Sequence, residues 1–120
     1  MTETLKQIRL QTNTKVTAAY AALSNDYNPL HVDADFAATT QFGAPVAHGA
    51  MALDLLMNAI EATFGHEQRT QVDIRFTAPV MVGECITAGG ERMDDGFSVW
   101  VRKDDGSVVL SGKMRLGTLT

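Results

Sequence analysis

A carboxylate and an imidazole stand five residues apart in the segment Ser24–His31, with Asn28 and Pro29 between them. Pro29 has a fixed φ and no backbone N–H, and it favours an extended conformation for Asn28. We therefore expect Asp26 and His31 to lie on a bend, with side chains free to converge. Such a pair can act as acid and base on a bound water. The same residue types are also common in ordinary turns, where Asp and Asn accept local N–H groups.

A second candidate, His48-Gly49, precedes the longest helical pattern in the chain. The first N–H groups of a helix have no intrahelical acceptor, and the helix dipole is positive there. Such a helix start can stabilise a developing oxyanion. An isolated glycine at a helix start more often reflects close packing, so both interpretations remain open at this point.

The other polar residues give weaker signals. His66 is expected on a solvated loop without a function, and the spacing of His31, His48 and His66 does not indicate a metal site. Cys85 is the sole cysteine, so an internal disulfide is excluded. No phosphate-binding glycine loop is present. We expect neither a metal nor a cofactor.

Composition places the chain among ordinary globular proteins. It has 120 residues, of which 45% are hydrophobic and 20% charged, so a single domain over residues 1–120 is expected. The net charge is −4 and basic residues do not cluster, which argues against a nucleic-acid partner. No apolar run reaches the roughly 18 residues of a membrane span. The first ten residues lack a signal-peptide core, and a cytoplasmic location is expected.

Two short helices are predicted in the first third of the chain. Thr17 is the expected N-cap of an alanine-rich helix over residues 18–23, which turn-forming residues then end. A second short helix is expected over residues 33–40. Its expected cap is Asp33, and its expected inward-facing residues are Phe36 and Ala37.

A much longer helix is predicted from residue 49 to residue 64, with Gly65 placed to end it. Its apolar residues recur at helical spacing, and they are Leu53, Leu56, Met57, Ile60 and Phe64. Another face carries Asp54, Asn58 and Glu61. This pattern is typical of a central helix that packs against a sheet.

Strand patterns dominate after this helix. Residues 72–77 alternate between apolar and polar types, and further strands are expected over residues 85–93, 97–102 and 108–116. Gly89-Gly90 is expected to mark a bulge or bend. A short strand is also expected within residues 5–16. A helix followed by a run of antiparallel strands indicates an α+β fold, and the exposed sheet edge suggests a dimer.

Two segments together resemble the signature of the MaoC-like, (R)-specific enoyl-CoA hydratases. Residues 23–33 read Leu-Ser-Asn-Asp-Tyr-Asn-Pro-Leu-His-Val-Asp, and residues 42–49 read Phe-Gly-Ala-Pro-Val-Ala-His-Gly. Residues 74–84 also resemble the strand and turn of this family. The resemblance implies a hot-dog fold, in which an antiparallel sheet wraps a long central helix, in a homodimer or an assembly of dimers.

The resemblance also implies roles for individual residues. Asp26 and His31 would activate a water that adds to C3 of a trans-2-enoyl thioester, carried by CoA or by an acyl carrier protein. The product would be a (3R)-3-hydroxyacyl thioester, and the reverse reaction is a dehydration. The Gly49 N–H would bond the thioester oxygen, with His48 and Asn28 as further substrate-binding residues.

Two positions depart from the family pattern. Asn25 stands where the family usually has glycine, and Met57-Asn58 stands where a small hydroxyl residue is common. Two other functions are compatible with the same fold. One is an acyl-CoA thioesterase, whose carboxylate on the central helix would be Asp54 or Glu61. The other is a non-catalytic acyl-thioester-binding subunit of a heteromeric hydratase, which would tend to lack the acid and histidine pair.

Overall fold

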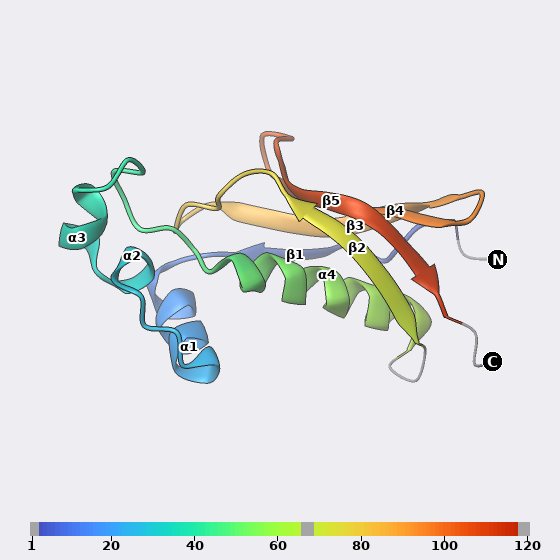
Figure 1. Cartoon of the computed structure of the whole chain (residues 1–120), viewed down its shortest axis with the longest axis horizontal. Coiled ribbons are helices and arrows are strands. Elements are labelled where there is room, and N and C mark those ends of the chain that lie inside the picture. The colour runs from blue at the N-terminus through green and yellow to red at the C-terminus, as the bar shows by residue number, and fades with distance from the viewer. Residues whose placement is uncertain (1–2, 66–68, 118–120) are drawn as a thin grey trace.

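The computed structural model describes residues 3–65 and 69–117, so the loop residue His66 lies outside the described residues. An antiparallel five-stranded sheet with the order β1-β3-β4-β5-β2 packs on one side of the long helix α4 (Gly49–Phe64) (Figure 1). The strands are β1 (Ile8–Gln11), β2 (Thr70–Phe76), β3 (Cys85–Met93), β4 (Gly96–Lys103) and β5 (Val108–Leu116). The predicted α+β class with a long helix against an antiparallel sheet is therefore confirmed.

Helix α4 has the predicted bounds. Gly65 ends it with a positive φ of 86°, and its N–H donates to the carbonyl of Glu61 over 2.7 Å. The buried residues of the helix are Met51, Ala52, Leu55, Leu56, Ala59 and Ile60. Three of the five residues predicted to face the core, Leu53, Met57 and Phe64, are only partly buried. The buried stripe is therefore rotated relative to the predicted one, and it includes the small residues Ala52 and Ala59.

The sheet presents one apolar face to α4, with Phe97, Val99 and Val101 of β4 at its centre. The predicted bulge at Gly89-Gly90 is wrong, because the pairing of β3 with β4 is continuous there. The irregularity lies instead between Val101 and Arg102, where β4 pairs with β5. Gly89 is small for a packing reason: a Cβ there would lie 2.5 Å from a ring carbon of Trp100.

Three helices, α1 (Thr14–Ser24), α2 (Pro29–Val32) and α3 (Ala34–Ala38), gather beyond the N-terminal end of α4 (Figure 1). The predicted N-cap at Thr17 is wrong. Asn13 caps α1 by accepting from the Val16 N–H over 2.8 Å, and Thr17 lies inside the helix. An Asx cap four residues earlier outcompetes Thr17, whose hydroxyl donates to the Asn13 carbonyl instead.

The predicted cap of the next helix is confirmed, since the Asp33 carboxylate accepts from the Phe36 N–H over 3.1 Å. Ala37 is buried as expected, but the prediction that Phe36 faces inward is wrong, because its side chain is 46% exposed. Helix α3 projects past the end of the sheet (Figure 1). Among the described residues, no helix is long and apolar enough to cross a bilayer.

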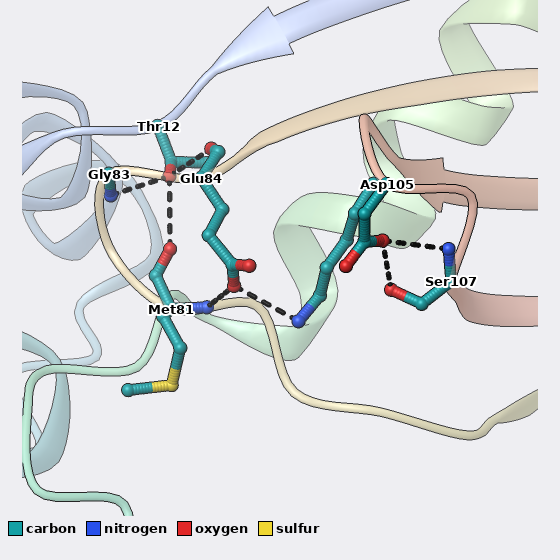
Figure 2. Close-up of polar contacts among 7 residues, drawn as sticks. Thr12, Met81, Gly83, Glu84, Asp105 and Ser107 are labelled. Carbon is teal, nitrogen blue, oxygen red and sulfur yellow. Dashed lines mark hydrogen bonds and ion pairs between the residues drawn. The ribbon is translucent and has the colours of Figure 1, made fainter.

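The connection between β2 and β3 is fastened to the end of β1 (Figure 2). The Thr12 hydroxyl donates to the Glu84 carbonyl over 2.6 Å and accepts from the Gly83 N–H over 3.0 Å. The Glu84 carboxylate accepts from the Met81 N–H over 2.7 Å and pairs with Lys103 over 3.0 Å. Thr12 is fully buried. These bonds give a segment without regular secondary structure a fixed position.

Candidate active site

The turn that delivers Asp26 begins with a residue in an unusual backbone conformation. Asn25 follows α1 with a φ of 57° and a ψ of 33°, and it is the sole non-glycine residue with a positive φ in the described chain. Asparagine tolerates this left-handed region better than most residues. The Asp26 N–H donates to the Ala21 carbonyl over 3.1 Å, which closes the turn. Asn25 therefore makes the turn that glycine usually makes in the family pattern.

His31 lies on the short helix α2, and not on the open bend that the sequence predicts. Asn28 is extended as predicted, with a φ of −51° and a ψ of 128°, and its Oδ1 accepts from the Leu30 N–H over 3.0 Å. Pro29 occupies the first helical position, where its fixed φ favours a helix and its missing N–H costs nothing. The helical turn brings His31 back towards Asp26.

Asp26 and His31 converge, with 3.8 Å between Oδ2 of the carboxylate and Nε2 of the ring. The other carboxylate oxygen, Oδ1, accepts from the Asn28 N–H over 3.2 Å. Asp26 therefore makes the local bond of an ordinary turn with one oxygen and faces the imidazole with the other. A separation of 3.8 Å is too long for a direct hydrogen bond, but one water can bridge it. The His31 side chain is 13% exposed and that of Asp26 is 50% exposed.

A backbone carbonyl sets the tautomer of His31. Its Nδ1 lies 2.6 Å from the carbonyl oxygen of Val46. A carbonyl only accepts, so Nδ1 carries a proton, and in the neutral ring Nε2 presents its lone pair towards Asp26. Val46 is itself fixed, because its N–H donates to the Leu30 carbonyl over 3.1 Å and it pairs with Met81 through an isolated β-bridge. No pattern in the sequence indicates this role of Val46, since a backbone atom performs it.

His48, directly before α4, contacts both members of the pair. Its side chain is buried, with 3% of the residue exposed. Its Nε2–H donates to the Asp26 carbonyl over 2.9 Å, and its ring stacks on His31 with 4.0 Å between centroids and 27° between planes. The Nδ1 atom of His48 is buried and has no hydrogen-bond partner among the described residues.

A pocket of about 410 Å³ brings Gly49 together with both histidines. Gly49 is the first residue of α4, so its N–H has no intrahelical acceptor. The opposite wall comes from the end of β2 and the connection after it, including Phe76, Ala78, Pro79 and Val80. Asp26 and Asn28 are not part of this lining. The sequence prediction missed the opposite wall, because these residues carry no reactive groups and lie far along the chain.

The described residues also include a candidate metal-binding group. One donor atom each from Asp26, His31 and His48 lies within 4.8 Å of the others. One nitrogen of each ring donates to a backbone carbonyl, which leaves Nε2 of His31 and Nδ1 of His48 as the ring atoms that can still accept or ligate. The gap between Asp26 and His31 can also be bridged by one water.

The carboxylates expected for a thioesterase lie elsewhere. Asp54 accepts from the Tyr20 hydroxyl over 2.6 Å and lines a different pocket of about 360 Å³ between α1 and α4. Burial, and then the hydrogen bond and charge of Asp54, raise the pKa of Tyr20 to about 12. Glu61 is exposed on α4. Neither carboxylate lines the pocket that holds His31 and Gly49.

An antiparallel sheet against a long helix, with an acid and an imidazole beside the start of that helix, places the chain among hot-dog proteins. Its structure is similar to that of the (R)-hydratase from Aeromonas caviae involved in PHA biosynthesis, with a TM-score of 0.78 and 30% identity, covering 97% of this chain and 98% of that one. An R-hydratase from Pseudomonas aeruginosa gives a TM-score of 0.81 and 25% identity, covering 100% and 88% of the two chains.

The family model of the MaoC like domain matches residues 1–108, and the chain belongs to this family. It is 40% identical over 73 residues to an (R)-specific enoyl-CoA hydratase from Aeromonas caviae, covering 59% of this chain and 54% of that protein. It is 31% identical over 108 residues to a peroxisomal hydratase-dehydrogenase-epimerase from Neurospora crassa, covering 88% of this chain and 12% of that protein. The match thus spans about half of the first relative and a small part of the second.

Proposed function

We propose that this protein is a hydro-lyase that adds water to trans-2-enoyl thioesters and forms (3R)-3-hydroxyacyl thioesters, or catalyses the reverse dehydration. The observation that carries the proposal is the 3.8 Å gap between the Asp26 carboxylate and Nε2 of His31, beside the Gly49 amide. The names of the relatives, (R)-specific enoyl-CoA hydratases, support the same reaction. The site therefore combines a base that can activate water with an N–H donor that can stabilise an oxyanion.

In the forward reaction, Asp26 and His31 hold one water between them. As the water oxygen bonds to C3 of the substrate, one of its protons passes to the pair. The electrons of the C2–C3 double bond shift towards the thioester carbonyl, and C2 then takes a proton from the pair. The net reaction adds H and OH across the double bond. Acid and base groups of this kind contribute about 10²–10⁴-fold to the rate.

The Gly49 N–H donates to the thioester oxygen while that oxygen carries enolate charge. Because α4 begins at this residue, the helix dipole also favours negative charge there. One oxyanion donor is typically worth about 10²–10³-fold in kcat.

Asn28 and His48 serve the same site in less direct ways. The Asn28 Oδ1 is occupied by the Leu30 N–H, and this bond orients the amide nitrogen as a donor for the bound water or substrate. His48 lines the pocket between His31 and Gly49. The substrate class is a thioester of CoA or of an acyl carrier protein.

We also propose that two copies pair through β2, an edge strand of the sheet. It pairs with β5 on one side, and the described residues place no strand on the other. Antiparallel self-pairing centred on Ile74 sets Asp73 of one copy opposite Arg75 of the other, and opposite charges in such positions are favourable. Phe76, which lines the pocket and is 50% exposed, would then lie beside the interface.

The direct test is the loss of enoyl-thioester absorbance when the protein is added to a short trans-2-enoyl-CoA, with free thiol measured in parallel. We expect absorbance loss without thiol release, and chiral analysis should identify the (3R) product. Thiol release without hydration would identify a thioesterase. If neither CoA nor acyl-carrier-protein substrates of any chain length are turned over, the protein is a binding subunit and the proposal is wrong.

A further inference from the structure

A buried histidine that neither reaction step uses lies at the centre of the site. The carbonyl of Asp26 accepts from Nε2 of His48, so in the neutral form of this ring the proton lies on Nε2. Its buried Nδ1 is therefore an acceptor without a partner among the described residues. Buried polar atoms without partners destabilise a fold, and each one in a native structure calls for an explanation. A leucine or phenylalanine would fill the same space without this cost.

The explanation lies in what the ring touches. His48 holds the Asp26 backbone by a hydrogen bond and covers one face of the His31 imidazole at 4.0 Å. The stack limits rotation of the His31 ring, while the bond that Nδ1–H donates to the Val46 carbonyl selects its tautomer. The backbone of His48 leads directly into Gly49. One residue therefore connects the acid, the base and the oxyanion donor.

Tyr20 of α1 closes this arrangement from the other side. Its ring lies 5.0 Å from the His48 ring at an angle of 50°, so the rings of Tyr20, His48 and His31 form a column. The Tyr20 hydroxyl donates to Asp54, in the second turn of α4, over 2.6 Å. This bond anchors the outer end of the column to the helix that begins with Gly49.

We propose that His48 is a positioning residue, which sets the geometry between Asp26 and His31 and does not itself bind substrate, with Tyr20 holding it in place. This inference rests on the proposed hydratase function and changes the expected role of His48.

Kinetics of four variants test the inference: His48→Ala, His48→Gln, Tyr20→Phe and Leu23→Ala. A misplacement of about 1 Å can cost about 10²-fold in rate, so we expect His48→Ala to lower kcat by about that factor with KM nearly unchanged. His48→Gln keeps an amide donor for the Asp26 carbonyl and should recover part of the loss. Leu23→Ala, on the exposed side of α1, is the control and should behave as wild type.

Tyr20→Phe removes one hydroxyl and keeps the ring, so it tests the column even if His48→Ala does not fold. We expect a few-fold fall in kcat at constant KM. A rise in KM at constant kcat in the His48 variants would identify a substrate-binding residue and overturn the inference. A wild-type kcat in His48→Ala would also overturn the inference. The proposed hydratase function would be unaffected by that result.

A second readout does not depend on activity. Long-range proton–nitrogen NMR spectra of the histidine rings report which nitrogen of His31 carries the proton. The wild type should show the Nδ1-protonated tautomer alone. In His48→Gln and Tyr20→Phe the less restrained His31 ring can rotate away from the Val46 carbonyl, so a mixture of tautomers should appear. If the wild type fails to hydrate any enoyl thioester, the proposed function is wrong, and these spectra still decide the positioning role. An unchanged single tautomer in both variants would refute it.

Discussion

Nδ1 of the His31 ring and the carbonyl oxygen of Val46 lie 2.6 Å apart, and this hydrogen bond leaves the opposite nitrogen free to face Asp26. A backbone atom 15 residues away in the sequence therefore determines which nitrogen of His31 can act as the base. The bond between Val46 and Leu30, and the bridge to Met81, hold that atom in place. The reactivity of His31 thus depends on packing that its own segment does not contain.

Replacing either member of the pair should abolish hydration without unfolding the protein. Asp26→Asn keeps an Oδ1 acceptor for the Asn28 N–H but removes the charge, and His31→Ala removes the base. We expect a loss of about 10²–10⁴-fold in kcat for each. Steady-state hydration assays measure the loss, and circular dichroism and gel filtration check the fold. Near-wild-type turnover by either variant would contradict the assignment.

Gly49→Ala should separate the oxyanion site from the fold. A Cβ at Gly49 meets only Cε1 of Phe76 within 4 Å, at 3.9 Å, so the helix can accept it. Unfolding in urea should change by about 1 kcal/mol or less, because alanine is a better helix former. The methyl group lies in the pocket, so kcat should fall by about 10-fold or more. Ala50→Gly is the matched control, with lower stability and normal kcat.

Tyr20 should remain protonated well above the ordinary tyrosine pKa of about 10, because burial and Asp54 raise its pKa to about 12. The folded state therefore favours the protonated phenol more strongly than the unfolded chain does. Its contribution to stability is therefore complete below about pH 10 and is lost as the pH rises towards about 12. Absorbance titration of the variant Tyr27→Phe, in which Tyr20 is the one remaining tyrosine, measures the pKa of Tyr20.

Asp54→Asn in the same background is the control for the Tyr20 titration. The pKa should fall but stay above its ordinary value, because burial is the largest cause of the shift. Urea unfolding at about pH 9 and about pH 11 should show the loss of stability with rising pH. Titration of Tyr20 near pH 10 would contradict both the burial of its hydroxyl and the hydrogen bond to Asp54.

Asn25 should tolerate glycine better than alanine. Its φ of 57° lies where a Cβ is disfavoured, and alanine lacks the polar side chain that helps asparagine there. We expect Asn25→Ala to lower the free energy of unfolding by about 1 kcal/mol and Asn25→Gly to change it by about 0.5 kcal/mol or less. Urea denaturation measures both. Equal effects would show that the left-handed turn does not persist in solution.

The proposed dimer predicts a charge-reversal pattern on β2. Arg75→Asp alone should set like charges opposite each other and shift the protein towards monomer, as measured by light scattering during gel filtration. The double variant Asp73→Arg, Arg75→Asp restores opposite charges and should restore the dimer. If the single variant dimerises as well as wild type, another surface or register forms the interface.

The sequence predicted the fold well where local patterns and packing agree. The bounds of α4 follow from its apolar spacing and from Gly65, and the four later strands follow from alternation and turn residues. The predictions from sequence were wrong where a neighbouring residue takes over the expected role. Asn13 outcompetes Thr17 as the N-cap of α1, and Gly89 is a packing site for Trp100 where a bulge was expected.

The residues of the candidate site were likewise predicted only in part. The reactive groups Asp26, His31 and Gly49 were found from residue type and spacing. The Val46 carbonyl, the Tyr20 ring and the pocket wall at Phe76 were not, because their roles come from tertiary contacts between segments far apart in the sequence. Such contacts leave no local pattern to read.

The bonds that fasten the β2–β3 connection to Thr12 have a kinetic consequence. The connection pairs with the segment around Val46, so the orientation of His31 depends on a chain of contacts that begins at the end of β1. Closing such long loops is slow compared with forming a helix. During refolding, we therefore expect helical signal to return first and catalytic turnover to return last.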